Sequence, residues 1–169
     1  MAPCLAVADL TSVWGWLEDS SIGASVRESL WLFPAIETIH LLGMALLFTT
    51  IAAFDLRLLG LTLRGTPAHE LARRLFPWAW AGFAVQVITG ALLFSSEATK
   101  MAVNPAFRLK MLLIVLAGLH ALTFRLLARR RMTAWDANRP TPRTARLAGI
   151  TSLALWIGVV AAGRWIGFI

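Results

Sequence analysis

Residues 31–61 read WLFPAIETIHLLGMALLFTTIAAFDLRLLGL and decide the fold. The run is longer than the roughly 20 apolar residues that a helix needs to cross a bilayer. It nevertheless carries Glu37 and His40 well inside its apolar part. Ionisable side chains at membrane depth are costly, so their default interpretation is a functional one. The stretch therefore predicts a membrane helix that carries a functional site.

The whole chain has the composition of a membrane protein. It contains 169 residues, of which 58% are hydrophobic, well above the usual share in soluble domains. This length holds one domain of about four helices of roughly 20 residues each. We predict an all-α fold, an integral membrane four-helix up-down bundle over residues 31–169. The expected spans are residues 29–61, 76–98, 107–127 and 147–168.

Residues 1–30 precede the bundle as an acidic, amphipathic N-terminal segment. The one cysteine, Cys4, rules out an internal disulfide or a cysteine-rich metal site, and we expect it to be a free thiol. Four apolar residues form a short patch that we expect to lie on the membrane surface. They are Val13, Trp14, Trp16 and Leu17.

The basic residues predict the orientation of the chain. The formal net charge is +7, but the arginines stand at the ends of apolar runs, which indicates topology and contact with phospholipid rather than nucleic acid. The connectors after the first and third spans hold eleven arginines, and the remaining segments hold five basic residues. By the positive-inside rule these connectors are cytoplasmic and both termini lie outside.

His40 and His120 predict a cofactor site. His40 lies nine residues after Trp31, and His120 lies ten residues after Lys110. At 1.5 Å per residue these counts place the two imidazoles about 14 and 15 Å below the outer surface. The first and third helices of an up-down bundle are parallel and diagonal. The pair is typical of bis-histidine ligation of one b-type haem in the outer half; the alternative for each is an interhelical hydrogen bond.

Small and cationic residues fit the same hypothesis. Gly43 lies three residues after His40, and Gly82 and Gly90 lie on nearly one face of the second span. Glycines there leave room for a flat macrocycle or for a neighbouring helix. Haem propionates need cations near the outer surface, although each such cation is also an ordinary interfacial anchor. The candidates are Lys100, Arg108, Lys110 and Arg164.

Glu37 lies three residues before His40 and so on the same helix face. Glu-x-x-His occurs in di-iron bundles, but these need further carboxylates on facing helices, and Glu97 and Asp55 stand at the wrong depths. Glu37 therefore orients His40, passes protons or binds a quinol, or else it tethers the N-terminal segment through Arg27.

Two other ionisable positions have structural interpretations. His69 stands in the first connector, where we expect it to be solvated. Asp55 closes the first span, and an ion pair with Arg57 or Arg125 at the inner interface is expected.

Three motifs carry a family resemblance: LFPAIETIHLLG at 32–43, DLRLLG at 55–60 and NPAFRLKMLL at 104–113. They resemble an uncharacterised family of small bacterial four-helix integral membrane proteins, which implies this architecture and a location in the bacterial cytoplasmic (inner) membrane. The chain is more loosely similar to small membrane cytochromes b. These often carry four helix-borne histidines for two haems, so the two here imply at most one haem.

The first functional hypothesis is a b-type haem-binding electron-transfer subunit, rather than a stand-alone enzyme. It would exchange electrons between the quinone pool and another membrane or periplasmic redox protein, with a homo-oligomer as a further option. The alternative is a haem-free membrane anchor or assembly subunit of a larger complex. A small proton or solute carrier that uses Glu37 and His40 is the third. We identify no catalytic residues.

Overall fold

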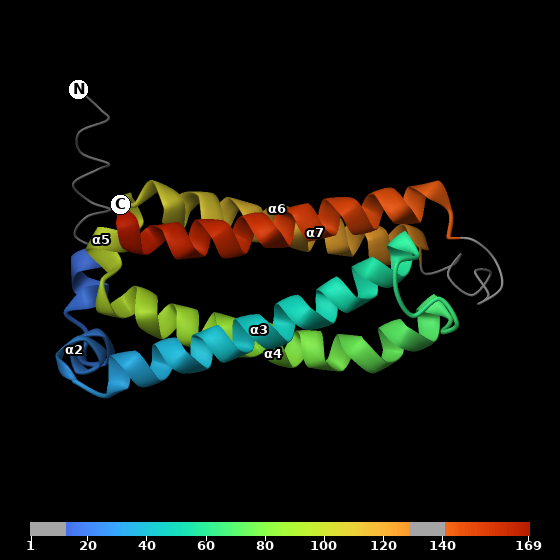
Figure 1. Ribbon diagram of the computed structural model, residues 1–169. Coiled ribbons are helices and arrows are strands. Elements are labelled where there is room, and N and C mark those ends of the chain that lie inside the picture. The colour runs from blue at the N-terminus through green and yellow to red at the C-terminus, as the bar shows by residue number, and fades with distance from the viewer. Residues whose placement is uncertain (1–12, 129–140) are drawn as a thin grey trace, which may run out of the picture.

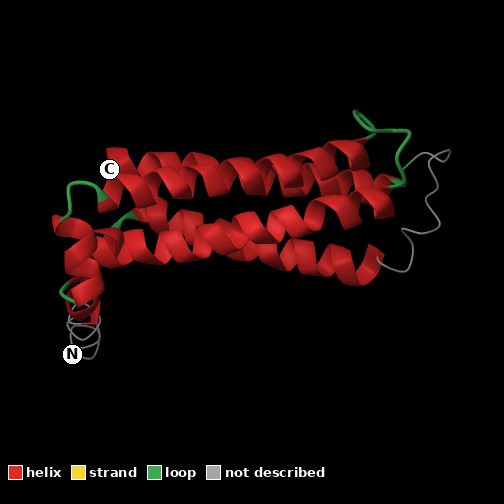
Figure 2. Ribbon diagram, turned by 90° about the horizontal axis from the view of Figure 1, so that it is seen from below, coloured by secondary structure: helices red, strands yellow, loops and turns green. Residues whose placement is uncertain are grey.

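The computed structural model describes residues 13–128 and 141–169, and every regular element in these ranges is helical (Figures 1 and 2). Residues 13–18 form a first short helix. The labelled elements are α2 (Ser21–Glu28), α3 (Leu32–Leu59), α4 (Ala68–Ser96), α5 (Ala98–Val103), α6 (Pro105–Ala128), α7 (Arg143–Trp165) and the 3₁₀ turn η2 (Ile166–Phe168).

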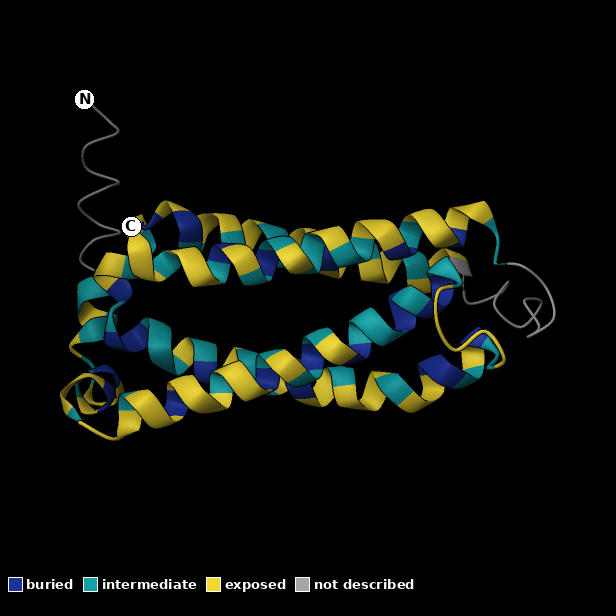
Figure 3. Cartoon of the chain, viewed as in Figure 1, coloured by how far each residue is buried: buried dark blue, intermediate teal, exposed yellow. Residues whose placement is uncertain are grey.

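The four long helices α3, α4, α6 and α7 are each long and apolar enough to cross a membrane. Exposed residues recur along these helices (Figure 3). Many of them are large and apolar; Leu42, Ile88 and Leu119 are each more than half exposed. Such a surface suits lipid rather than water. The predictions of an all-helical fold and of a four-helix membrane protein are thus confirmed.

The four helices share two ends that serve as reference points below (Figure 1). At the terminal end α3 and α6 begin and α4 and α7 finish, and the C-terminus lies there. At the connector end α3 and α6 finish and α4 and α7 begin. The short elements α2, α5 and η2 lie at the terminal end.

Helix α4 begins at Ala68, eight residues before the predicted start at 76. The first turns of α4 are amphipathic. Ala68, Leu71 and Ala72 are buried, while Arg74 pairs with Glu70 at 2.6 Å on the exposed side, and these charged residues made the segment look like a polar connector in the sequence. The polar connector expected up to Arg74 is therefore mostly helix.

The start of α6 is set by Asn104. Its Oδ1 accepts hydrogen bonds from the backbone N–H groups of Ala106 and Phe107, at 2.9 and 3.1 Å. This is a standard N-terminal cap, followed by Pro105 in the first turn, where a missing N–H does no harm. The six-residue α5 just before it has no counterpart among the predicted elements.

Helices α3 and α4 make the closest contact of the bundle. A Cβ atom on Gly82 of α4 would lie 2.9 Å from the backbone nitrogen of Leu47 in α3, and one on Gly43 would lie 2.6 Å from Val85 Cγ1. Only glycine allows backbones to approach so closely. Helix α6 packs on α7, and α7 in turn packs on α3; α6 and α7 lie together on one side of the bundle (Figure 1).

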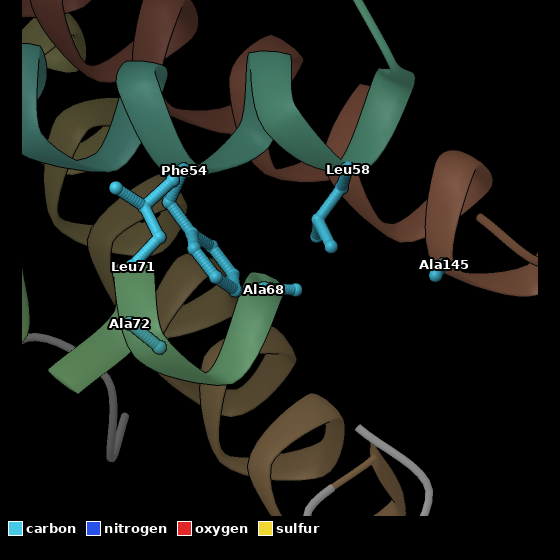
Figure 4. Close-up of a cluster of buried hydrophobic side chains, with 6 residues drawn as sticks. All are labelled: Phe54, Leu58, Ala68, Leu71, Ala72 and Ala145. Atoms are coloured by element: carbon cyan, nitrogen blue, oxygen red, sulfur yellow. The ribbon is translucent and has the colours of Figure 1, made fainter. Parts of the chain in front are cut away.

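The tightest apolar core lies at the connector end (Figure 4). Phe54 packs edge-on against Phe76 and Phe124, with ring centroids 5.2 and 6.3 Å apart, and so joins three helices. The buried residues of this core are Phe54, Leu58, Ala68, Leu71, Ala72 and Ala145.

The N-terminal segment packs on the terminal end of the bundle. Gly23 of α2 is buried because its backbone lies against the Ser95 carbonyl of α4, 2.6 Å from where a Cβ would stand. Trp14 meets Phe94 edge-on at 5.5 Å. Part of the expected membrane-surface patch thus contacts protein, whereas Trp16 stays exposed. Cys4 lies outside the described residues.

Candidate functional site

His40 lies in the half of the bundle nearest the terminal end, two turns into α3. Its Nδ1 is 2.8 Å from the hydroxyl oxygen of Thr89 in α4. The same hydroxyl donates to the Val85 carbonyl at 2.6 Å, so its single proton is already used. His40 Nδ1 must therefore carry the proton, and Nε2 keeps a free lone pair. In the described part of the chain, Nε2 makes no hydrogen bond.

His120 lies in the opposite half. Its Nε2 donates to the carbonyl of Ala148 in α7 at 3.0 Å, because a carbonyl can only accept. The next residue, Gly149, packs against the Asp55 backbone of α3. Asp55 stands fifteen residues beyond His40, about 22 Å at 1.5 Å per residue.

The expectation that the two histidines share one depth is therefore wrong. It took Lys110 as the membrane edge of the third span, but Lys110 lies inside the bundle, near His40. Two axial ligands must reach one iron from opposite faces. His40 and His120 of one chain are too far apart for that, so a haem held by this pair within one chain does not fit.

Lys110 is a half-buried cation inside the bundle. Its side chain packs on Gly163 of α7, with Nζ 3.6 Å from the place of a Cβ there. It lines a cavity of about 30 Å³ together with Gln86 and Met44. Among the described residues no carboxylate lies within 4.0 Å of it to form an ion pair. The described part of the bundle therefore holds a half-buried amine without an acidic partner.

Gln86 links this cavity to His40, because its side-chain amide donates to the His40 carbonyl oxygen. Gly90 faces the imidazole: a Cβ there would lie 3.3 Å from His40 Cε1. The predicted cofactor glycines thus pack α4 against α3 and against the ring of His40.

The other predicted cations have protein partners. Lys100 pairs with Glu97 at 3.6 Å, Arg108 Nε donates to the Ala102 carbonyl at 2.8 Å, and Arg164 lies over the Phe168 ring at 5.1 Å. Each of these contacts anchors a chain segment at the terminal end. None of the three is at His40.

The remaining ionisable candidates lie apart from His40. Glu37 and His69 are exposed. Arg27 pairs with Glu18 at 3.4 Å and lies 3.9 Å from Asp19, so the expected tether to Glu37 does not form. Asp55 makes no ion pair with Arg57 or Arg125 either, which contradicts the expected inner-interface pair.

A groove of about 400 Å³ opens at the terminal end, one helical turn beyond His40 and Lys110. Phe94 lies four residues after Gly90, and Phe107 three residues before Lys110, on the same helix faces. The rings of Phe94 and Phe107 stack at 5.2 Å and 15°. Sequence reasoning missed this groove because its walls come from four separate elements. The lining residues are Trp14, Phe94, Ala102, Phe107, Arg108 and Met111.

Within residues 13–128 and 141–169, no three His, Cys, Asp or Glu side chains gather to hold a metal ion. The fold and the site define an all-helical membrane protein with a polar cluster inside one half. The chain belongs to a family of unknown function, DUF6644, whose model matches residues 13–169. No curated protein and no solved structure matches it.

Proposed function

We propose that this protein is a membrane subunit of a bacterial redox system that binds the headgroup of a quinone or quinol in the groove at the terminal end. The observation that carries the proposal is the groove itself, with aromatic walls and Arg108 at its side, one turn from His40 and Lys110. Its volume lies within the range of small-molecule sites.

The chemistry of the lining suits a flat, amphipathic ring. Phe94 and Phe107 offer ring faces and edges for stacking. Arg108 uses its Nε toward the Ala102 carbonyl, which leaves the terminal guanidinium nitrogens as donors to a quinone carbonyl. The apolar surface of the surrounding helices would accept an isoprenoid tail.

His40 and Lys110 give the proton chemistry. A quinol that passes two electrons to a one-electron carrier of a partner must release two protons. Nε2 of His40, unprotonated and roughly one turn deeper, is a basic nitrogen for one of them, and the other leaves to water through the open mouth of the groove. The positive charge of Lys110 favours a semiquinone or quinolate anion nearby. The chain itself supplies the binding site, and the partner supplies the redox centre.

The proposal includes an orientation. The arginines of the described connector residues, such as Arg64 and Arg143, lie at the connector end. We therefore propose an up-down bundle in the cytoplasmic membrane with this end inside, and with the groove and both termini outside.

Quinone titration of the purified protein in lipid nanodiscs tests the proposal, with ubiquinone-1 as the probe and quenching of tryptophan fluorescence as the signal. We expect saturable quenching, because Trp14 lines the groove. Arg108→Gln removes a charged hydrogen bond and should weaken binding about tenfold. Lys100→Gln is the matched control, since Lys100 is exposed at the same end but outside the groove. Quenching that rises linearly with the quinone concentration would refute the proposal. So would an affinity of Arg108→Gln for the quinone equal to that of Lys100→Gln.

A second candidate, a b-type haem on His40 alone, is favoured by one observation: the fixed Nδ1–H tautomer presents the Nε2 lone pair that an iron needs. The second axial ligand would then come from another chain, for example in a homo-oligomer. A reduced-minus-oxidised absorption spectrum separates the candidates. A b-type band that disappears in His40→Ala but persists in His120→Ala supports the haem, and a colourless protein rejects it.

A further inference from the structure

Asp55 is the most buried acidic residue among the described residues. It lies one turn before the end of α3, with only 4% of its surface exposed. Among the described residues, its Oδ2 atom has no hydrogen-bond partner. A buried polar atom without a partner is rare and needs an explanation.

Among the described residues, no cation pairs with the Asp55 carboxyl. Arg57, two residues away, is committed elsewhere, because its Nε donates to the Thr66 carbonyl at 2.7 Å and one Nη to the Thr141 hydroxyl at 3.4 Å. On α6, His120 uses its Nε2 toward Ala148. On α4, Glu70 and Arg74 pair with each other. The other arginines of these helices near the connector end are exposed: Arg73, Arg125, Arg143 and Arg146.

Helix α7 closes over the carboxyl. A Cβ on Gly149 would lie 3.1 Å from the Asp55 carbonyl oxygen, so the α7 backbone passes directly against α3. Ser152, one turn further along α7, places its hydroxyl next to the Asp55 carboxyl. In the described part of the chain, the buried carboxyl therefore has the neutral Ser152 hydroxyl as its side-chain neighbour.

An ionised carboxylate in this setting would be strongly destabilising, since it is buried and no counter-ion among the described residues compensates its charge. A hard metal cation would lower that cost, but it needs about six oxygen ligands. In the described part of the chain no three acidic, histidine or cysteine side chains gather at one point. A single proton needs only one oxygen atom, and the Oδ2 atom of Asp55, which has no partner among the described residues, can bind it.

We propose that Asp55 is an intramembrane proton-binding site at the connector end, and that its neutral carboxyl keeps α7 docked on α3. The bound ligand is the proton. Its loss would leave an uncompensated charge in the α3–α7 contact, so release of the proton must loosen this contact. The site is independent of the proposed quinone groove, which lies at the opposite end.

Infrared spectroscopy of the full chain in liposomes tests the proposal at neutral pH, where an aspartate in water has lost its proton. We expect the carbonyl-stretch band of a protonated carboxylic acid, with a small shift in heavy water. Asp55→Asn keeps the neutral shape and should remove the band completely. The matched control Glu37→Gln changes an exposed glutamate of the same helix and should leave the band intact.

Ser152→Ala removes the neighbouring hydroxyl and should move the band without abolishing it. A spectrum without any protonated-carboxyl band, or a band that persists in Asp55→Asn, would overturn the proposal. Each spectrum is assigned without reference to quinone binding.

Discussion

The hydroxyl of Thr89 holds the imidazole of His40 in one tautomer across the α3–α4 contact. The His40 Nδ1–H donates to Thr89 Oγ1 at 2.8 Å while the hydroxyl proton goes to the Val85 carbonyl at 2.6 Å. The pairing is directional, so both the proton and the lone pair of the ring have assigned positions. Whatever His40 binds, it must bind through Nε2.

Thr89→Val should release this tautomer. Valine keeps the shape of threonine but cannot accept, so a buried Nδ1–H loses its partner at a cost of about 1–3 kcal/mol. We expect the ¹⁵N signals of His40 to change from an Nδ1-protonated ring to a mixture of tautomers. Thr89→Ser should preserve the wild-type signals.

Thr38→Val is the matched control for this measurement. Thr38 is exposed on α3 and bonds only to the Pro34 carbonyl of its own helix, at 2.7 Å. Its loss should leave the ring of His40 unchanged. An unaltered tautomer in Thr89→Val would contradict the hydrogen-bond assignment.

The four long helices could be predicted from the sequence, whereas the relative depth of His40 and His120 in the bundle could not. Long apolar runs set the four spans, because a bilayer demands length and apolarity from each helix separately. The relative depth of His40 and His120 depends on how α3 and α6 slide along α7, which no single helix encodes. The depth estimate rested on Lys110 as a surface marker. Its long apolar stem and small neighbour Gly163 instead allow it to lie inside.

The groove and the Asp55 site could likewise not be predicted from patterns within single helices. Trp14 and Phe94 lie eighty residues apart in sequence, yet their rings meet at 5.5 Å. Asp55 and Arg57 form the motif of a helix-end ion pair, but the guanidinium turns to Thr66 and Thr141 instead. Spacing along one helix indicates which groups share a face, whereas the partner of each group is decided by tertiary packing.

Gly82→Ala should destabilise the bundle. The added methyl would lie 2.9 Å from the Leu47 backbone nitrogen, and two helix backbones cannot give way as a side chain can. Overpacking of this kind costs about 1–3 kcal/mol. We expect a lower midpoint of thermal unfolding in detergent, followed by circular dichroism.

Gly118→Ala provides the control at a helical glycine with open space. Nothing lies within 4 Å of its added methyl, and alanine favours a helix over glycine by about 1 kcal/mol. Its midpoint should be equal or higher. A fall as large as that of Gly82→Ala would show that the α3–α4 contact is not the cause.

Glu18 should make the docking of the N-terminal segment pH-dependent. Its carboxylate accepts from the Thr99 backbone N–H at 2.9 Å, at the start of α5. Hydrogen bonds from Thr99 lower the pKa of Glu18 below its ordinary value of 4.5, and Arg27 lowers it further. A lowered carboxyl pKa stabilises the folded state above the ordinary value, and that contribution is lost as the pH falls through the folded-state pKa.

Hydrogen exchange at the Thr99 amide measures this effect. Once the known acid dependence of exchange is corrected for, protection should fall when the pH drops below about 4.5. Glu18→Gln should reduce protection at neutral pH, because the amide accepts more weakly than a carboxylate. Asp19→Asn is the control, since this exposed neighbour contacts only Arg27. Equal protection of the Thr99 amide in wild type and Glu18→Gln would show that the Glu18 carboxylate does not hold this amide.

His120→Ala should act on stability and not on cofactor binding. The His120 Nε2–H to Ala148 bond joins α6 to α7 at 3.0 Å, and an interhelical hydrogen bond of this kind contributes about 0.6 kcal/mol on average in a membrane protein. We therefore expect a small fall in unfolding midpoint with unchanged quinone titration. His69→Ala changes an exposed histidine and should alter neither. His120 stands ten residues beyond Lys110, about 15 Å at 1.5 Å per residue, and Lys110 lies near His40. Any loss of ligand binding in His120→Ala would therefore require a second chain to bring the two rings together.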